Sequence, residues 1–523
     1  SFPTRRSSDL GFLEHHEMMH TLEFVRSDAM TRLRTCSYLE GKDLSGQKEI
    51  RFSDLVLFTH DALYDGQRQW AKRVAETQNI KLTKPPIRGW CSWYYDYFWF
   101  SGDQVEDYMH AFKPYQDDLN LNVFVMDANY FAHLGDWLET NRNFPKGLKY
   151  YAELIQKNGY VPGIWIGPWM VGDRSRLFEE HPDWMVKDMD GNLIEFMNPL
   201  GEDNVWGFRD KIHYCLDTSH PEAFEYLKTV FKTLRDWGFR YFKTDFMYWG
   251  AMDRFEGGWY HEGLNAHNFI ENREDQPLIK RHTPGKTRVE YFQDVVKMIR
   301  EQVGEDSVIL GCGQPMLMSA GYADCMRISR DVGARWEAHN SPKELLHDLQ
   351  LRNFMNGVFF QVDPDCVLLR HFEHKLTDDE VTSLALYMGV SQGMIMTSDP
   401  LHKCLQERLE LFKFIQADND HIVFKPPLLG EERDLIIYVG YRNDSDLRVL
   451  FCFNPSEETV NKSLTFKDLD LPAENHMMEW NSAQKIEKIN NQIDVQLNPH
   501  QSRLFYLKKT KFENGYQPAR ISG

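Results

Sequence analysis

From residue 85 to about residue 420, short apolar segments that resemble strands alternate with amphipathic segments that resemble helices. This alternation constrains the fold more than any other feature, because it predicts parallel strands joined by helices in an α/β sheet or barrel. Pro85 and Pro86 mark the boundary at which the pattern begins. About eight such units predict a (β/α)8 TIM barrel with insertions. The expected strands are residues 88–94, 122–127, 161–167, 240–246, 307–312, 326–329, 357–362 and 393–398.

The clearest helix is expected in the stretch TSHPEAFEYLKTVFKTLRDWG, residues 218–238. Ser219 and Glu222 have the spacing of a capping box, and Pro221 suits a first helical turn. Gly238 follows the last expected turn, as glycine often does at the end of a helix.

The flanking regions have a different character. Residues 1–10, SFPTRRSSDL, look foreign to the rest of the chain, and we expect them to be a non-native leader left by cloning or sequencing. We then interpret residues 11–84 as a truncated N-terminal β-sandwich with a linker, ahead of the barrel at residues 85–420. Residues 421–523 return to strand-like segments separated by turns, which predicts a C-terminal antiparallel β-sandwich.

Charge and cysteine content exclude several classes of function. The formal net charge of -18 makes nucleic acid and anionic membranes poor partners, and no apolar run is long enough to span a bilayer. The 8 Cys are scattered without a CxxC pair, so neither a disulfide framework nor a zinc ribbon is indicated. A reducing, cytoplasmic compartment fits this pattern best, and no cofactor is implied.

Carboxylates and tryptophans collect near the ends of the expected strands, where barrels place their chemistry. A single aspartate after a strand is more often a turn or helix-capping residue. Several on one rim suit a glycosidase, which needs one carboxyl group to attack or activate water and another to protonate the leaving oxygen. Aromatic faces can also pack on a sugar ring, although a large core explains many of them equally well. The residues are Asp127, Asp245, Asp331, Asp363, Asp365 and Asp399, with Trp90, Trp93, Trp165, Trp169 and Trp336.

The stretch FKTDF places Lys243 and Asp245 two positions apart, so that both point to one face of an expected strand. Buried charges are costly unless they are paired or used. One interpretation is a structural ion pair between them. The other is a catalytic site, in which Asp245 is the nucleophile and Lys243 keeps it ionised.

Several stretches together resemble glycoside hydrolase family 36, the melibiase-type α-galactosidases. They are GWCSWYY, GDWLETNRNFPKGLKYYAELIQKNGYVPGIWIGPW, HPDWMVKD, YFKTDF, ILGCGQP, MRISRDVGARW and DPDCVLLR, in this order from about Gly89 to Asp399. The resemblance implies an exo-acting enzyme that hydrolyses terminal α-galactosides with retention, through a covalent glycosyl-enzyme. Its substrate would be a small α-galactoside oligosaccharide, and family members often form homo-oligomers.

The resemblance also implies roles for individual residues. Asp245 matches the nucleophile of the lysine-x-aspartate motif, and Asp331 matches the acid/base. The residues expected to bind the sugar are Asp127, Trp165, Lys243, Cys312 and Arg327, with Trp93 and Trp336 as aromatic neighbours. Burial against Trp336 is a hypothesis for how Asp331 keeps a proton.

The stretch MDANYF departs from the family pattern, which commonly has two adjacent aspartates that bind O4 and O6 of the sugar. Here Asp127 is followed by Ala128, so one acceptor is lost where hydrogen bonds to hydroxyls discriminate strongly. Asn129 or Asp96 could substitute. Otherwise the glycone differs, and α-N-acetylgalactosamine and β-L-arabinopyranose are the variants that we consider.

Other functions remain as alternatives. HEMMH, residues 16–20, satisfies the H-E-x-x-H pattern of zinc hydrolases, with His16 and His20 as ligands and Glu17 as base, but that motif requires a helix. The DPDC stretch could bind a cation, although a turn that braces the active-site rim is the simpler interpretation. The remaining alternatives are that the enzyme is a transglycosylase, or that the protein is a non-catalytic homologue that only binds carbohydrate.

Overall fold

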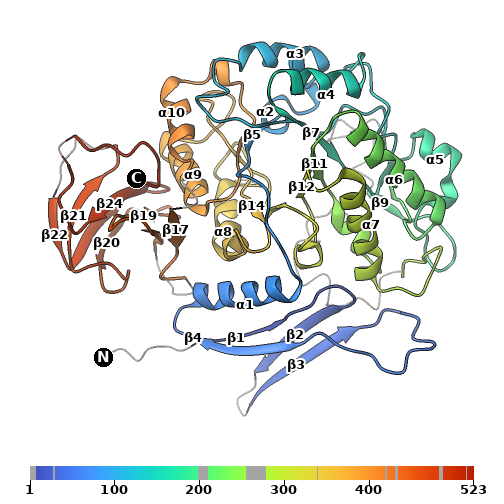
Figure 1. The fold of residues 1–523 in the computed structure, drawn as a ribbon, viewed down its shortest axis with the longest axis horizontal. Coiled ribbons are helices and arrows are strands. Elements are labelled where there is room, and N and C mark those ends of the chain that lie inside the picture. Colours follow the sequence, from blue (N-terminus) through green and yellow to red (C-terminus); the bar gives the residue numbers. More distant parts are fainter. Residues whose placement is uncertain are drawn as a thin grey trace.

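The structure is a computed structural model that describes residues 7–26, 30–197, 210–254, 278–337, 340–417, 421–429, 434–481, 487–513 and 515–523. Two β regions flank a central region of strands and helices, one below it and one at its left in Figure 1. The N-terminal strands lie on one side, beneath α1 (Leu63–Thr77), and the C-terminal β domain lies beside α8 (Pro342–Arg352) and α9 (Asp378–Ser391).

The central region is built on a parallel sheet with the strand order β14-β13-β12-β11-β7-β6-β5-β16-β15. The two ends of this order, β14 and β15, are separated in the chain only by Pro364 and Asp365, so that one bent segment pairs with β13 on one side and β16 on the other. This arrangement fits a TIM-like barrel. The strands are β5 (Arg88–Cys91), β6 (Val123–Met126), β7 (Val161–Ile166), β11 (Tyr241–Thr244), β12 (Val308–Gly311), β13 (Cys325–Arg327), β14 (Gln361–Asp363), β15 (Cys366–Val367) and β16 (Ile395–Thr397).

Each expected barrel strand overlaps an observed one, and most observed strands are shorter. The first strand was expected to continue to residue 94, but β5 ends at Cys91 and Trp93 begins the short helix α2 (Trp93–Asp96). Trp93 is therefore not a strand residue. The remaining helices of this region are α3 (Gly102–Ala111), α4 (Leu148–Lys157), α5 (Arg176–Glu180), α6 (Pro221–Asp236), α7 (Arg288–Val303) and α10 (Gln406–Phe414), and a small sheet contains β8 (Met170–Gly172), β10 (His213–Cys215) and β9 (Glu195–Met197).

Helix α6 begins with a different cap from the one expected. The N-cap is His220, whose Nδ1 accepts a hydrogen bond from the backbone N–H of Glu222, so the expected capping box at Ser219 is wrong. The Ser219 hydroxyl instead donates to Asp217, 2.7 Å away. Pro221 does occupy the first turn, because its missing N–H would have no partner there.

The N-terminal region contains two antiparallel strand pairs. β1 (Ser7–Phe12) pairs with β4 (Leu55–His60), and β2 (Met19–Arg26) pairs with β3 (Thr31–Tyr38). Residues 7–10, which belong to the expected non-native leader, therefore lie in the paired strand β1. Helix α1 contacts β1 and β4 with its buried face.

The C-terminal domain is antiparallel, as expected, and has its own apolar core. Its contact with the barrel region contains Trp336, whose ring stacks on His500 at a centroid distance of 4.3 Å and lies 6.0 Å from Phe453. Glu380 of α9 joins the same contact through His500. The strands are β17 (Ile422–Lys425), β18 (Ile436–Arg442), β19 (Arg448–Phe453), β20 (Val460–Thr465), β21 (Glu474–Glu479), β22 (Glu487–Asn490), β23 (Gln492–Leu497) and β24 (Ser502–Lys508).

Candidate active site

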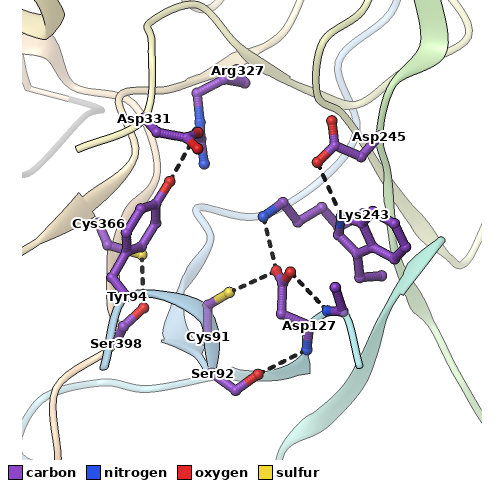
Figure 2. Close-up of polar contacts among 12 residues, drawn as sticks. Cys91, Ser92, Tyr94, Asp127, Lys243, Asp245, Arg327, Asp331, Cys366 and Ser398 are labelled. Carbon is purple, nitrogen blue, oxygen red and sulfur yellow. Dashed lines mark hydrogen bonds and ion pairs between the residues drawn. The ribbon is translucent and has the colours of Figure 1, made fainter. Parts of the chain in front are cut away.

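A buried ion pair lies at the carboxyl ends of two barrel strands. Lys243 of β11 donates from Nζ to Oδ2 of Asp127, which directly follows β6, at 2.8 Å (Figure 2). The Asp127 carboxylate also accepts from the Cys91 thiol at 3.2 Å and from its neighbour's backbone N–H, that of Ala128, at 2.8 Å. The paired charge and these hydrogen bonds offset the cost of burying the carboxylate inside the protein.

Asp245 lies just beyond β11, where the chain turns at Phe246 with a φ of 53°. Its carboxylate accepts from the Trp165 indole Nε1 at 3.0 Å and from the Phe246 backbone N–H at 2.7 Å. Burial raises the pKa of Asp245 above its ordinary value, while the positive charge of Lys243 and the Trp165 hydrogen bond act in the opposite direction. Asp245 is thus a partly buried carboxylate that is held in place by two hydrogen bonds.

Arg327 of β13 connects three carboxylates. Its guanidinium donates to Asp331 at 2.9 Å, to Asp363 at 3.1 Å and to Asp365 at 2.9 Å. The Tyr94 hydroxyl donates to Asp365. It also lies 3.4 Å from Arg327 (Figure 2). The DPDC stretch therefore braces the rim through Arg327, which agrees with the simpler of its two sequence interpretations.

Asp331 is more open than its neighbours, with 36% of its side chain exposed, whereas the side chain of Arg327 is 6% exposed. The negative charge of Asp331 contributes to the raised pKa of Asp245, so the two carboxyl groups share one electrostatic environment. Figure 2 shows them on opposite sides of a central space, with Lys243 pointing between them. Both carboxyl groups are partly exposed, and they differ in their partners, which are Trp165 for Asp245 and Arg327 for Asp331.

Seven of the nine residues expected in the site lie together. They are Asp127, Trp165, Lys243, Asp245, Cys312, Arg327 and Asp331. The Cys312 thiol follows β12, and the charges of Asp245, Arg327 and Lys243 all act on its pKa, which burial raises well above the ordinary value. The expected role of Trp336 is not supported, because its ring packs against the C-terminal domain.

Asp96 and Asn129 were the proposed substitutes for the missing second aspartate. Their described side-chain hydrogen bonds lie outside this cluster. Asp96 accepts from the Gln104 amide at 2.7 Å and from the Tyr108 hydroxyl at 3.0 Å, both in α3. Asn129 donates to the backbone carbonyl of Phe98 at 2.5 Å. Ala128 itself is buried and offers no side-chain oxygen.

Sequence reasoning missed two polar side chains that complete the cluster. Cys91 and Tyr94 both lie in the RGWCSWY stretch, in which only the tryptophans were singled out. Asp365 was predicted among the rim carboxylates without a partner, and the structure shows that it binds Arg327, Tyr94 and the backbone N–H of Val332. A period-2 reading of the first strand would have pointed to Cys91, because it alternates with Trp90 across the sheet.

The zinc-hydrolase alternative is not supported by the local structure. His20 lies in strand β2 rather than in a helix, and its Nδ1 is 2.7 Å from the Ser37 hydroxyl. Nδ1 of His16 is 3.3 Å from the Gln293 amide nitrogen. Throughout the described ranges, no group of three or more His, Cys, Asp or Glu side chains could hold a metal ion. In the same ranges, no helix has the length and apolar character needed to cross a membrane.

Comparisons with known proteins agree with the sequence resemblance. Residues 67–248 match the family model described as Melibiase. An alpha-galactosidase from Escherichia coli is 26% identical over 234 residues, covering 42% of this chain and 29% of that protein. For two further curated α-galactosidases the aligned regions cover 13% and 12% of the relative. The chain thus spans less than a third of the length of these three relatives.

Solved structures share the fold at lower identity. TtGalA, an alpha-galactosidase from Thermus thermophilus in complex with p-nitrophenyl α-D-galactopyranoside, has a TM-score of 0.61 and 22% identity, covering 81% of this chain and 75% of that one. A GH27 β-L-arabinopyranosidase from Geobacillus stearothermophilus in complex with arabinose has a TM-score of 0.60 and 16% identity, covering 85% and 99%. The comparisons together show a match to the Melibiase family over residues 67–248 and a fold that is shared with solved α-galactosidase structures.

Proposed function

We propose that this protein is a retaining, exo-acting α-galactosidase that hydrolyses terminal α-galactosides of small oligosaccharides by double displacement. The observation that supports it most is the arrangement of Asp245 and Asp331. Both are partly exposed, but the first is held by the Trp165 indole and the second by the Arg327 guanidinium. A glycosidase needs such a pair of carboxyl groups in two different environments.

The proposed reaction begins with attack of the Asp245 carboxylate on the anomeric carbon. Asp331 gives its proton to the glycosidic oxygen as that bond breaks, and the leaving group departs as an alcohol. The sugar is then joined to Asp245 through an ester. Asp331 next removes a proton from water, which attacks the anomeric carbon and releases the sugar and the Asp245 carboxylate.

The surrounding groups fit these roles. Lys243 favours the ionised form of Asp245 through its positive charge, and it is held in place by Asp127. The Asp127 carboxylate is buried beside the Lys243 ammonium group. We therefore propose that these two side chains together bind a sugar hydroxyl. Arg327 positions Asp331 and is itself fixed by Asp363 and Asp365.

A second candidate function, hydrolysis of a different glycone, also has support. Ala128 supplies no carboxylate beside Asp127, and the described contacts of Asp96 and Asn129 lie elsewhere. A sugar without one hydroxyl partner, such as β-L-arabinopyranose, or one with a changed C2 substituent, α-N-acetylgalactosamine, would suit such a pocket. The β-L-arabinopyranosidase with the same fold agrees with this second candidate.

An aryl-glycoside panel tests the proposal. Initial rates are measured on 4-nitrophenyl α-D-galactoside, α-N-acetyl-D-galactosaminide, β-L-arabinopyranoside and α-D-glucoside, and the anomeric configuration of the first product is followed by NMR. We expect α-galactoside hydrolysis with an α-anomer as first product. Activity on the second or third substrate alone would show that the protein acts on a different glycone.

The control for the panel is Asp245→Asn, which keeps the shape of the side chain and removes the nucleophile. Silence of the folded, unaltered protein on all four substrates would overturn the proposed activity. Release of the β-anomer would overturn the double-displacement mechanism while leaving the substrate class intact. Sugar transfer to an added acceptor in preference to water would identify a transglycosylase.

A further inference from the structure

The segment that follows strand β5 is almost wholly aromatic. Residues 93–99 read WYYDYFW, and they form the short helix α2 and the 3-10 turn η1 (Tyr97–Trp99). A large core would explain such a run if its side chains were all buried. They are not, because Tyr97 is 40% exposed and Trp99 is 85% exposed. Trp99 has the highest exposure of the large apolar side chains in the described residues.

One end of the segment belongs to the catalytic cluster. Tyr94 is buried, and its hydroxyl donates to Asp365 and lies 3.4 Å from Arg327, which holds Asp331. The Trp93 ring contacts Tyr97 edge-on at a centroid distance of 5.5 Å. The segment therefore leads from the group around Asp331 toward solvent.

The Tyr97 hydroxyl lies within electrostatic reach of Asp331. Burial raises the pKa of its hydroxyl, the positive charge of Arg370 lowers it, and the negative charges of Asp331 and Asp365 raise it. Arg370 also lies over the ring of Tyr95 at 5.7 Å. The loop that carries Arg370 and the aromatic segment thus meet at the same part of the rim.

The backbone of this turn is held in an uncommon conformation. Tyr97 has a φ of 45°, which bulky side chains rarely adopt and which persists only when the surroundings enforce it. Here the Asn129 amide holds the Phe98 carbonyl, the Phe100 side chain is fully buried, and the Ser101 side chain caps helix α3. These contacts fix the turn that presents Trp99 to solvent.

We propose that Tyr97 and Trp99 form the subsite for the leaving saccharide, the sugar that is released when the glycosidic bond breaks. This inference rests on the proposed function. Asp331 must reach the glycosidic oxygen, so the leaving group lies on its side of the site, away from Asp127 and Lys243. An exposed indole and a half-exposed phenol supply flat apolar faces for the C–H face of a pyranose, together with one hydroxyl for a hydrogen bond.

The test compares two galactosyl donors that differ only in the leaving group. Melibiose releases a glucose, which would occupy the subsite, whereas α-D-galactosyl fluoride releases an ion too small to do so. For Trp99→Ala we expect kcat/KM on melibiose to fall about tenfold and kcat/KM on the fluoride to stay within about twofold. Trp99→Phe, which keeps a flat ring, should recover part of the loss.

The matched control is Leu351→Ala, an exposed apolar residue on α8 that is 46% exposed. It should leave both substrates unaffected. Equal losses on the two donors, or no loss on either, for a folded Trp99→Ala protein would overturn the subsite. Inactivity of the unaltered protein on both donors is a separate result, and it would overturn the proposed function and this inference together.

Discussion

Lys243 and Asp127 form a buried ion pair across the barrel, with a distance of 2.8 Å from Nζ to Oδ2. Their strands, β11 and β6, are separated in the sheet by β7. Burial alone would lower the pKa of Lys243, but its attraction to the Asp127 carboxylate raises that pKa well above the ordinary value. The lysine is therefore charged, and its charge acts both on its partner Asp127 and on Asp245, the carboxylate that we propose as the nucleophile.

Removal of one member of this pair should cost more stability than removal of both. Lys243→Met leaves the buried Asp127 carboxylate without an opposite charge, and we expect the free energy of unfolding to fall by about 3–5 kcal/mol. Adding Asp127→Asn should recover part of that loss, since no unpaired charge then remains. Urea unfolding of the two single variants and the double variant measures the coupling between them.

The control for this cycle is Lys232→Met, which breaks an exposed pair with Asp236. It should cost less than about 1 kcal/mol, because solvent screens exposed ion pairs. Additive losses in the Lys243 and Asp127 variants would contradict a buried pair.

Asp245→Ala should abolish turnover, by about 10³-fold or more, because it removes the carboxylate that we propose forms the covalent intermediate. Added azide should restore part of the rate, since a small anion can occupy the space of the missing carboxylate. The glycosyl azide should then have the inverted, β configuration, which NMR distinguishes. Asp236→Ala, at an exposed site, should behave like the unaltered protein, and undiminished turnover by Asp245→Ala would remove Asp245 from the mechanism.

Asp331→Ala should separate substrates by the quality of their leaving groups. We expect about a 10²–10⁴-fold loss of kcat/KM on melibiose, whose leaving oxygen needs a proton. The loss on α-D-galactosyl fluoride should be much smaller, because fluoride departs with little help from an acid. Parallel losses on both substrates would assign Asp331 to sugar binding rather than to proton transfer.

Asp96 should make the protein less stable as pH rises. Burial raises its pKa to about 6, despite hydrogen bonds from Tyr108 and Gln104 that favour the ionised form. The folded state then binds the proton more tightly than the unfolded chain, in which the aspartate pKa is about 3.9. The contribution of Asp96 to stability is therefore fully present below about pH 4 and is lost as pH rises through about 6.

Asp96→Asn removes this titration while keeping an oxygen that can accept from Gln104. The Tm of the variant minus the Tm of the unaltered protein should increase from pH 4 to pH 7, as measured by calorimetry at several pH values. A difference in Tm that does not change with pH would show that Asp96 keeps an ordinary affinity for protons.

The sequence by itself predicted the order of the barrel strands and the residues at their ends. Apolar segments of strand length, separated by amphipathic helices, have few ways to bury their surfaces, and parallel connection is the main one. Residues that end parallel strands then meet at one rim, which is why Asp127, Asp245 and Arg327 lie together although they are far apart in the chain. Local sequence was sufficient for these features because they depend on periodicity and on chain direction.

Only the tertiary structure decided which side chains form pairs. The period of a strand suggested that Lys243 could pair with Asp245, but β11 ends at Thr244 and the turn at Phe246 directs Asp245 to Trp165. Lys243 pairs instead with Asp127, two strands away in the sheet. Trp336 is close to Asp331 in sequence, yet it packs on His500, which comes from the C-terminal domain. Charged groups and rings select partners by distance and burial in three dimensions, and spacing along one strand does not contain that information.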